Sequence, residues 1–226
     1  MKLELYFAPG ACSRVPMIAL EEIGQPFETH LVIFMKGEHK SPEYLTMNPA
    51  GKVPLLLADG QPISQNLAIQ TFLAKSFPDV GLLPFTGDPL VEARILGQLA
   101  WFSADLHPLV TRIRLPQFAC DAAPERVKEQ AMEAMAMQLG PLNQRLADRP
   151  FILGESWSAL DAYLHWVWFR ITGAGFDSAP FANIQTHYAM MNARPAVQRA
   201  LAREAEAQAY LEARGLMPVF SPEAAR

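Results

Sequence analysis

The chain has 226 residues, which is enough for one large domain or two small ones with a substantial core. Hydrophobic residues make up 50% and charged residues 19%, the balance of an ordinary globular protein. The net charge of −4 without a basic run argues against a nucleic-acid partner, and no apolar stretch is long enough to span a membrane.

The N-terminal segment places a cysteine between a strand and a helix. Residues 2–7 alternate as a strand and lack the long apolar core of a signal peptide, so we expect a cytoplasmic protein. Cys12 follows this strand and precedes a helix predicted over 14–24. Free backbone N–H groups at a helix start favour thiolate over thiol. Cys12 is therefore a candidate nucleophile or thiol-binding group; the alternative is a buried, inert cysteine.

The rest of the first 78 residues predicts a small mixed sheet covered by helices. Further strands are expected at 27–33, 55–58 and 61–63, and helices at 42–47 and 65–76. Asp59-Gly60 is a hairpin turn signal between the last two strands. The order βαβ, a short helix, then ββα predicts a thioredoxin-like α/β domain over residues 1–78.

A second, all-helical domain is expected over residues 89–226. Prolines and glycines concentrate in the preceding segment and mark residues 79–88 as a linker. Helices are predicted over 89–114, 124–147, from Ser158 onward, and over 180–193 and 195–213. Ser158 and Asp161 have the spacing of a capping box, a folding feature. Cys120 has no recognisable site around it, and two cysteines in different contexts suggest no disulfide.

Five segments in this order resemble those of the glutathione S-transferases, and most closely the bacterial beta class. They are APGACSRVPMIAL around Cys12, NPAGKVPLL at 48–56, ISQNLAIQTFLA at 63–74, AWFSADLHP at 100–108 and SALDAYL at 158–164. The resemblance covers the chain apart from about its last dozen residues. It implies the cytosolic glutathione S-transferase fold (βαβαββα followed by an all-α domain), with glutathione as co-substrate and no metal.

The resemblance also implies where glutathione binds. In the family the proline at Pro54 follows a cis peptide, and the Val53 N–H and C=O pair with the cysteinyl part of glutathione. Gln65 and Asn66 open a helix whose start would bind the γ-glutamyl carboxylate. The family usually has an acid at the first of these two positions, so an amide there puts affinity in doubt. Lys36 is expected near the glycyl carboxylate, with a solvated loop lysine as the alternative.

The resemblance also implies residues that contact the reacting sulfur and residues that line the site of the second substrate. His107 would exchange a hydrogen bond with the sulfur of Cys12 or of glutathione. Trp101 and Ser103 are expected to line the electrophile site, and Ala100 stands where the family often has an asparagine. Ser13 is a candidate to hydrogen-bond the glutathione thiolate. Pro108 is expected to kink this helix.

The implied activity is conjugation of the glutathione thiolate to small apolar electrophiles, a detoxification reaction, in a homodimer. A second hypothesis is thiol–disulfide exchange through Cys12, by a one-thiol route because Cys12-Ser13-Arg14-Val15 contains no second cysteine. A third is a non-catalytic or weakly active glutathione- or ligand-binding protein on the same scaffold. The identity of the electrophile is not encoded in any motif.

Overall fold

The computed structural model describes residues 1–217, which form two compact units. The first unit joins Met1–Phe85 to the segment that begins at Arg194, and the second unit is Thr86–Ala193. This division differs from the predicted one, because the last described helix packs with the first unit instead of the second. The end of the helical domain predicted over 89–226 lies outside the described residues.

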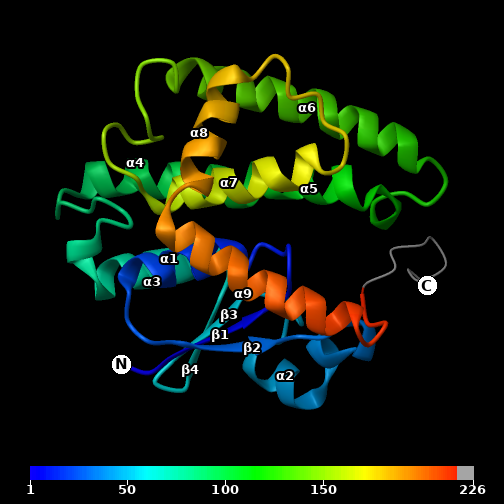
Figure 1. Cartoon of the computed structure of the whole chain (residues 1–226). Helices are drawn as coiled ribbons and strands as arrows, with labels where there is room; N and C mark the ends of the chain where they lie inside the picture. Colours follow the sequence, from blue (N-terminus) through cyan, green and yellow to red (C-terminus); the bar gives the residue numbers. More distant parts are fainter. Residues whose placement is uncertain (218–226) are drawn as a thin grey trace. The chain divides into compact units, whose positions relative to one another are not determined.

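The first unit is built on a four-stranded mixed sheet in the order β2-β1-β3-β4 (Figure 1). The strands are β1 (Leu3–Phe7), β2 (Glu28–Leu31), β3 (Leu55–Ala58) and β4 (Gln61–Ser64). β1 runs parallel to β2 and antiparallel to β3, and β3 pairs with β4 through the turn at Asp59 and Gly60, both with positive φ. The predicted thioredoxin-like sheet is confirmed, and each strand begins or ends within two residues of its prediction.

Helices cover both faces of this sheet (Figure 1). They are α1 (Arg14–Ile23), α2 (Pro42–Met47), α3 (Asn66–Ser76) and α9 (Pro195–Glu212), with short 3₁₀ turns η1 (Phe34–Lys36), η2 (Glu38–Lys40) and η3 (Pro78–Val80). α1 ends where Gly24 adopts the left-handed conformation and its N–H returns to the Leu20 carbonyl. On the opposite side of the sheet, Tyr44 of α2 packs in a buried cluster with Leu55 and Leu57.

Ion pairs along the line where α1 and α9 lie side by side explain why α9 belongs to the first unit (Figure 1). Arg14 donates to Glu204 from Nε at 3.0 Å and from Nη2 at 2.5 Å, and both side chains are almost completely buried. Glu21 accepts from the Nε atoms of Arg199 and Arg203, each at 2.6 Å. These pairs join residues about 180 positions apart, so α9 is held against the helix that follows Cys12.

The second unit contains α4 (Pro89–Ala100), a π-helical turn η4 (Trp101–Leu106), α5 (His107–Arg114), a 3₁₀ turn η5 (Pro116–Phe118), α6 (Pro124–Arg145), α7 (Ala159–Thr172) and α8 (Ala182–Asn192). The single helix predicted over 89–114 is thus interrupted by a wider turn. Pro108 has no N–H to donate to the preceding turn, which is a physical reason for the irregularity just before it. Among the described residues, no helix combines the length and the apolar character that a membrane crossing requires.

α7 is the central helix of the second unit, and a buried carboxylate fixes its start. Asp161 is fully buried; its Oδ2 accepts from the Ser158 N–H at 2.7 Å and from the Ser158 hydroxyl at 2.8 Å. Its Oδ1 accepts from the Ile152 N–H at 2.9 Å and lies 2.8 Å from Nε2 of His187. The predicted capping function of Ser158 and Asp161 is therefore confirmed and extends to α8 and to the preceding loop.

We predict that Glu204→Gln lowers the free energy of unfolding by about 3 kcal/mol, because it removes the counter-charge of a buried guanidinium. Urea denaturation followed by circular dichroism measures this change. Glu206→Gln is the matched control, since Glu206 lies two residues along the same helix and is exposed. Equal stability of the two variants would show that the buried pair does not hold α9.

We also predict that Asp161→Ala lowers the free energy of unfolding by about 2 kcal/mol or more, because two backbone N–H groups lose their acceptor. Asp148→Ala, at an exposed position of the same unit, is expected to change stability by less than about 0.5 kcal/mol. Thermal and urea unfolding of the two variants tests the difference. An Asp161 variant as stable as the Asp148 variant would contradict the assignment.

Candidate functional site

Three of the segments singled out in the sequence meet around Cys12. Cys12 lies in the turn between β1 and α1 and is partly buried. Its thiol donates a hydrogen bond to the Val53 carbonyl with a sulfur–oxygen distance of 3.5 Å. The Asn66 side-chain amide, at the start of α3, donates to the Cys12 carbonyl at 3.1 Å. The fold therefore joins the starts of two helices and the segment before β3 into one site.

Ser13 is placed differently from its neighbour. Its side chain is fully buried, and its hydroxyl donates to the Ala8 carbonyl at 3.2 Å and accepts from the Ala8 N–H at 3.3 Å. The two bonds close the loop that carries Cys12. To donate to a ligand thiolate, this hydroxyl would have to give up its bond to the Ala8 carbonyl, so the geometry favours a role in shaping the loop.

The segment before β3 is held by buried donors. The Val53–Pro54 peptide is cis, as the sequence resemblance implied. The preceding carbonyl, that of Lys52, accepts from the Tyr44 hydroxyl at 2.8 Å and from the Asn48 side-chain amide at 2.6 Å. Burial raises the pKa of Tyr44 to about 12, so its hydroxyl keeps its proton at any physiological pH.

Gln65 has a backbone conformation that residues other than glycine rarely adopt. Its φ is 75° and its ψ is 128°, immediately before α3, and its side chain is exposed. Such a conformation costs on the order of 1–3 kcal/mol in a non-glycine residue and persists only where the surrounding structure imposes it. Strain of this kind concentrates at binding sites. The next residue, Asn66, is buried, and its side-chain amide donates a hydrogen bond to the Cys12 carbonyl.

The lysine that contacts the Val53 segment is Lys40, not Lys36. Lys36 is exposed, and no hydrogen bond or ion pair joins its side chain to any of residues 1–217. Lys40 Nζ lies 3.5 Å from the Ala50 carbonyl and packs so closely on Gly51 that a Cβ there would lie 2.7 Å from it. Burial lowers the pKa of the adjacent His39, with the charge of Lys40 as a smaller cause. The sequence KGEHK contains these residues, but only the fold shows which lysine contacts the chain before Val53.

The predicted residues of the second unit lie on one stretch of chain. His107 Nδ1 is 2.9 Å from the Tyr163 hydroxyl, and the imidazole packs against Trp166 with ring centroids 4.6 Å apart. The Trp101 indole N–H donates to the Gln138 side chain at 2.8 Å, and the Ser103 hydroxyl donates to the Ala100 carbonyl at 3.1 Å. All three residues are partly buried and belong to the π-helical turn or to the first position after it.

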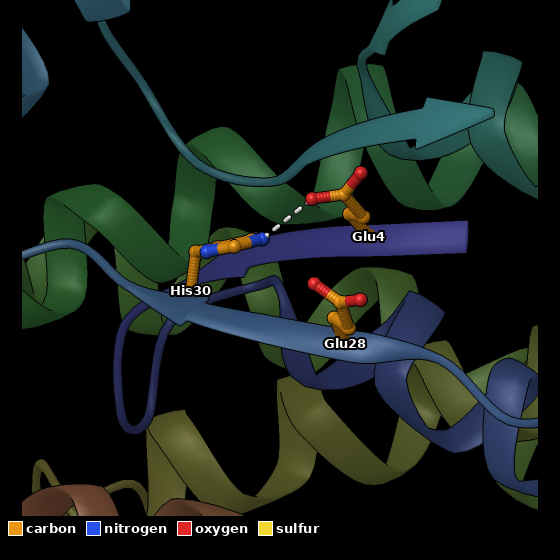
Figure 2. A group of neighbouring side chains, drawn as sticks. All are labelled: Glu4, Glu28 and His30. Atoms are coloured by element: carbon orange, nitrogen blue, oxygen red, sulfur yellow. Dashed lines mark hydrogen bonds and ion pairs between the residues drawn. The ribbon is translucent and has the colours of Figure 1, made fainter. Parts of the chain in front are cut away.

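One group of side chains has the composition of a metal site. Figure 2 shows Glu4 of β1 with Glu28 and His30 of β2, and their ligand atoms lie within 4.8 Å of one another. The Lys2 ammonium already pairs with Glu4 at 2.9 Å and with Glu28 at 3.4 Å. Hydrogen bonds from Lys2 and then from His30 lower the pKa of Glu4. A divalent cation would have to displace Lys2, so we assign no metal to these residues.

Comparison with known proteins shows which family this chain resembles. A family model described as the N-terminal domain of glutathione S-transferase matches residues 1–75. Glutathione S-transferase GST-4.5 of Xanthomonas campestris pv. campestris is 33% identical over 222 residues, which span 95% of this chain and 100% of that protein.

Solved structures agree with the sequence relatives. The structure of a sphingomonad glutathione S-transferase complexed with glutathione has 31% identity and a TM-score of 0.79, covering 89% of this chain and 98% of that one. The bacterial beta-class glutathione S-transferase of Sphingomonas chungbukensis has 29% identity and a TM-score of 0.78, with coverage of 89% and 98%.

Proposed function

The chain belongs to the glutathione S-transferase family, and we propose that it is a glutathione transferase that joins the sulfur of glutathione to small apolar electrophiles. The observation that carries the proposal is the meeting of Cys12, Val53 and Asn66 in one unit. Free glutathione has the backbone amides and carboxylates that such a site can bind. Two similar solved structures support the same substrate: one is a glutathione S-transferase complexed with glutathione, and the other is a bacterial beta-class glutathione S-transferase.

In this proposal glutathione lies along the backbone of Val53, ahead of Pro54. Its cysteinyl N–H and C=O pair with the Val53 C=O and N–H, as an added strand would. Its γ-glutamyl carboxylate lies at the start of α3, where Gln65 precedes the helix and Asn66 carries the first of the N-terminal backbone N–H groups. Its ammonium group meets the Gln65 amide.

The glycyl carboxylate of glutathione requires a cation nearby. Lys36 was the predicted partner and remains a candidate, because its side chain is exposed. Lys40 is the better-placed candidate, since it already packs on the chain just before Val53. A lysine ammonium can bind a carboxylate from several directions, so either residue supplies the required charge.

The chemical step needs a thiolate. An ordinary thiol has a pKa near 8.5 and is mostly protonated at neutral pH, so the site must favour the ionised form. The partial positive charge at the start of α1 does this for a sulfur near Cys12. The glutathione thiolate attacks the electrophilic carbon, the new sulfur–carbon bond forms, and the leaving group departs with its electron pair.

The other predicted residues assist this step. We propose that His107 exchanges a hydrogen bond with the reacting sulfur and that Trp101 and Ser103 line the electrophile site. Ser13 would act mainly through the loop it closes, given its bonds to Ala8. The proposed step uses no resident metal, since the start of α1 stabilises the thiolate.

We further propose that the protein is a cytoplasmic homodimer that detoxifies electrophiles without nucleic-acid or membrane partners. The family assignment and the acidic net charge of −4 support this. Light scattering at micromolar concentration tests the dimer, which predicts about twice the chain mass of 25.1 kDa. A single species at the chain mass would contradict it.

A second activity, thiol–disulfide exchange, is favoured by the exposure of part of Cys12 next to the proposed glutathione position. The Cys12 thiolate would attack a glutathionyl mixed disulfide, take the glutathionyl group and release the substrate thiolate. The thiolate of a second glutathione would then attack the Cys12 disulfide and leave as glutathione disulfide. Cys12 thereby returns to its starting state.

We predict that Cys12→Ala abolishes reduction of a glutathionyl mixed disulfide, because the covalent intermediate cannot form. Conjugation of glutathione to 1-chloro-2,4-dinitrobenzene is expected to fall by no more than about tenfold, because the start of α1 is unchanged. Cys120→Ala is the matched control and is expected to change neither activity. Unchanged disulfide reduction in the Cys12 variant would exclude the exchange role.

We predict that Gln65→Glu binds glutathione roughly fivefold more tightly, because a carboxylate adds charge to its contact with the ammonium group. Isothermal titration calorimetry measures the dissociation constants. Gln61→Glu, an exposed position on β4, adds the same charge away from the site and serves as the control. Unchanged or weaker binding by the Gln65 variant would count against this placement of glutathione.

Absence of turnover across a panel of electrophiles, with glutathione still bound, would instead support the non-catalytic alternative. The amide at Gln65 and the alanine at Ala100 are the two departures that favour this alternative. Gln65 lacks the charge that the family usually has at its position, and Ala100 lacks the polar side chain.

A further inference from the structure

Two buried donors converge on one backbone oxygen beside the proposed glutathione site. The Tyr44 hydroxyl lies 2.8 Å and the Asn48 side-chain amide 2.6 Å from the Lys52 carbonyl oxygen. Tyr44 is 5% exposed and Asn48 is 3% exposed. A carbonyl oxygen has two lone pairs, so these two donors fill its hydrogen-bonding capacity.

The acceptor belongs to the same peptide unit as the Val53 N–H. The carbonyl and the N–H of one peptide are held in a plane, so fixing the oxygen of Lys52 also fixes the direction of the Val53 N–H. Hydrogen bonds accepted by the oxygen polarise the peptide and strengthen the N–H as a donor. The Val53 carbonyl on the other side of this residue already accepts from Cys12.

The two donors are themselves held rigidly. Tyr44 packs with Val32, Leu55 and Leu57 against the sheet, and its ring meets Tyr6 edge-on with centroids 5.8 Å apart. Asn48 donates its own N–H to the Tyr44 carbonyl at 2.8 Å, and the Gly51 N–H returns to the Asn48 carbonyl at 2.9 Å. The turn after α2 is thus closed on itself and anchored in the core.

We propose that Tyr44 and Asn48 are positioning residues for glutathione binding, which act by orienting the Lys52–Val53 peptide. This inference rests on the proposed function. Neither side chain touches the ligand: both are buried behind the peptide, and their donors are used on Lys52. They therefore affect the affinity for glutathione, and other residues act on the reacting sulfur.

Tyr44→Phe tests the proposal, because it keeps the buried ring and removes only the hydroxyl. We expect the dissociation constant for glutathione and the KM for glutathione each to rise about fivefold, while kcat changes less than twofold. The matched control is Thr46→Val, which removes from the same helix an exposed hydroxyl that donates to the Pro42 carbonyl. Thr46→Val is expected to match the wild type.

A spectroscopic measurement reports on the peptide itself and does not depend on turnover. In ¹⁵N-labelled protein, the Val53 amide resonance is expected to shift in Tyr44→Phe and to respond less to added glutathione than in the wild type. Asn48→Ala should do the same, and Thr46→Val should not. A variant that fails to fold is recognised from its whole spectrum, and the other variant then provides the test.

The outcomes distinguish a failure of the proposed function from a failure of the positioning role. If the wild type does not bind glutathione, the proposed function fails. If the wild type binds glutathione and Tyr44→Phe binds it equally well with an unchanged Val53 resonance, the proposed function stands and the positioning role is overturned. A parallel fall of kcat and thermal stability without a change in KM would also overturn it, since that pattern reflects general destabilisation.

Discussion

The buried ion pair between Arg14 and Glu204 is the constraint on which the position of the candidate site depends. Removing one member of such a pair leaves a charge in a low-dielectric environment, so the two helices that carry it are strongly coupled. Arg14 is the first residue of α1 and follows Cys12 and Ser13 directly. Helix α9 therefore fixes the start of α1, which follows Cys12 in the chain.

From that fixed point, the site is organised mainly by backbone atoms. The Lys52 carbonyl accepts hydrogen bonds from the side chains of Tyr44 and Asn48. The Cys12 carbonyl accepts one from the Asn66 side chain, and the Val53 carbonyl accepts one from the Cys12 thiol. A site of this kind suits a peptide-like ligand, because the main chain of the ligand can pair with the main chain of the protein. Glutathione is such a ligand, and in the proposed binding mode its thiol lies near the start of α1.

Much of the first unit could be predicted because local sequence signals determine it. Alternating apolar residues identified the strands, Gly24 ended α1, and Asp59-Gly60 gave the hairpin. The segment around Val53 and Pro54 was identified by resemblance, and its cis peptide is confirmed. These features depend on residues close together in sequence, where periodicity and turn chemistry carry the information.

Other features depend on how loops fold back or on partners far away in sequence, and they could not be predicted. The two bonds of Ser13 to Ala8 exist only once the loop has folded back. Lys40 lies against Gly51 because two turns meet in space, whereas Lys36, a few residues earlier, points to solvent. The assignment of α9 to the first unit depends on charge pairs such as Glu21 with Arg199, which no local pattern reveals.

The central claim is that glutathione binds along the Val53 backbone with its sulfur beside Cys12, and a crystal structure of the protein with glutathione tests it most directly. We predict that the cysteinyl N–H and C=O of glutathione pair with Val53 and that its sulfur lies within about 4 Å of Cys12 Sγ, at hydrogen-bonding distance or bonded to it. Glutathione bound with its cysteinyl backbone away from Val53, or with its sulfur directed away from Cys12, would contradict the account.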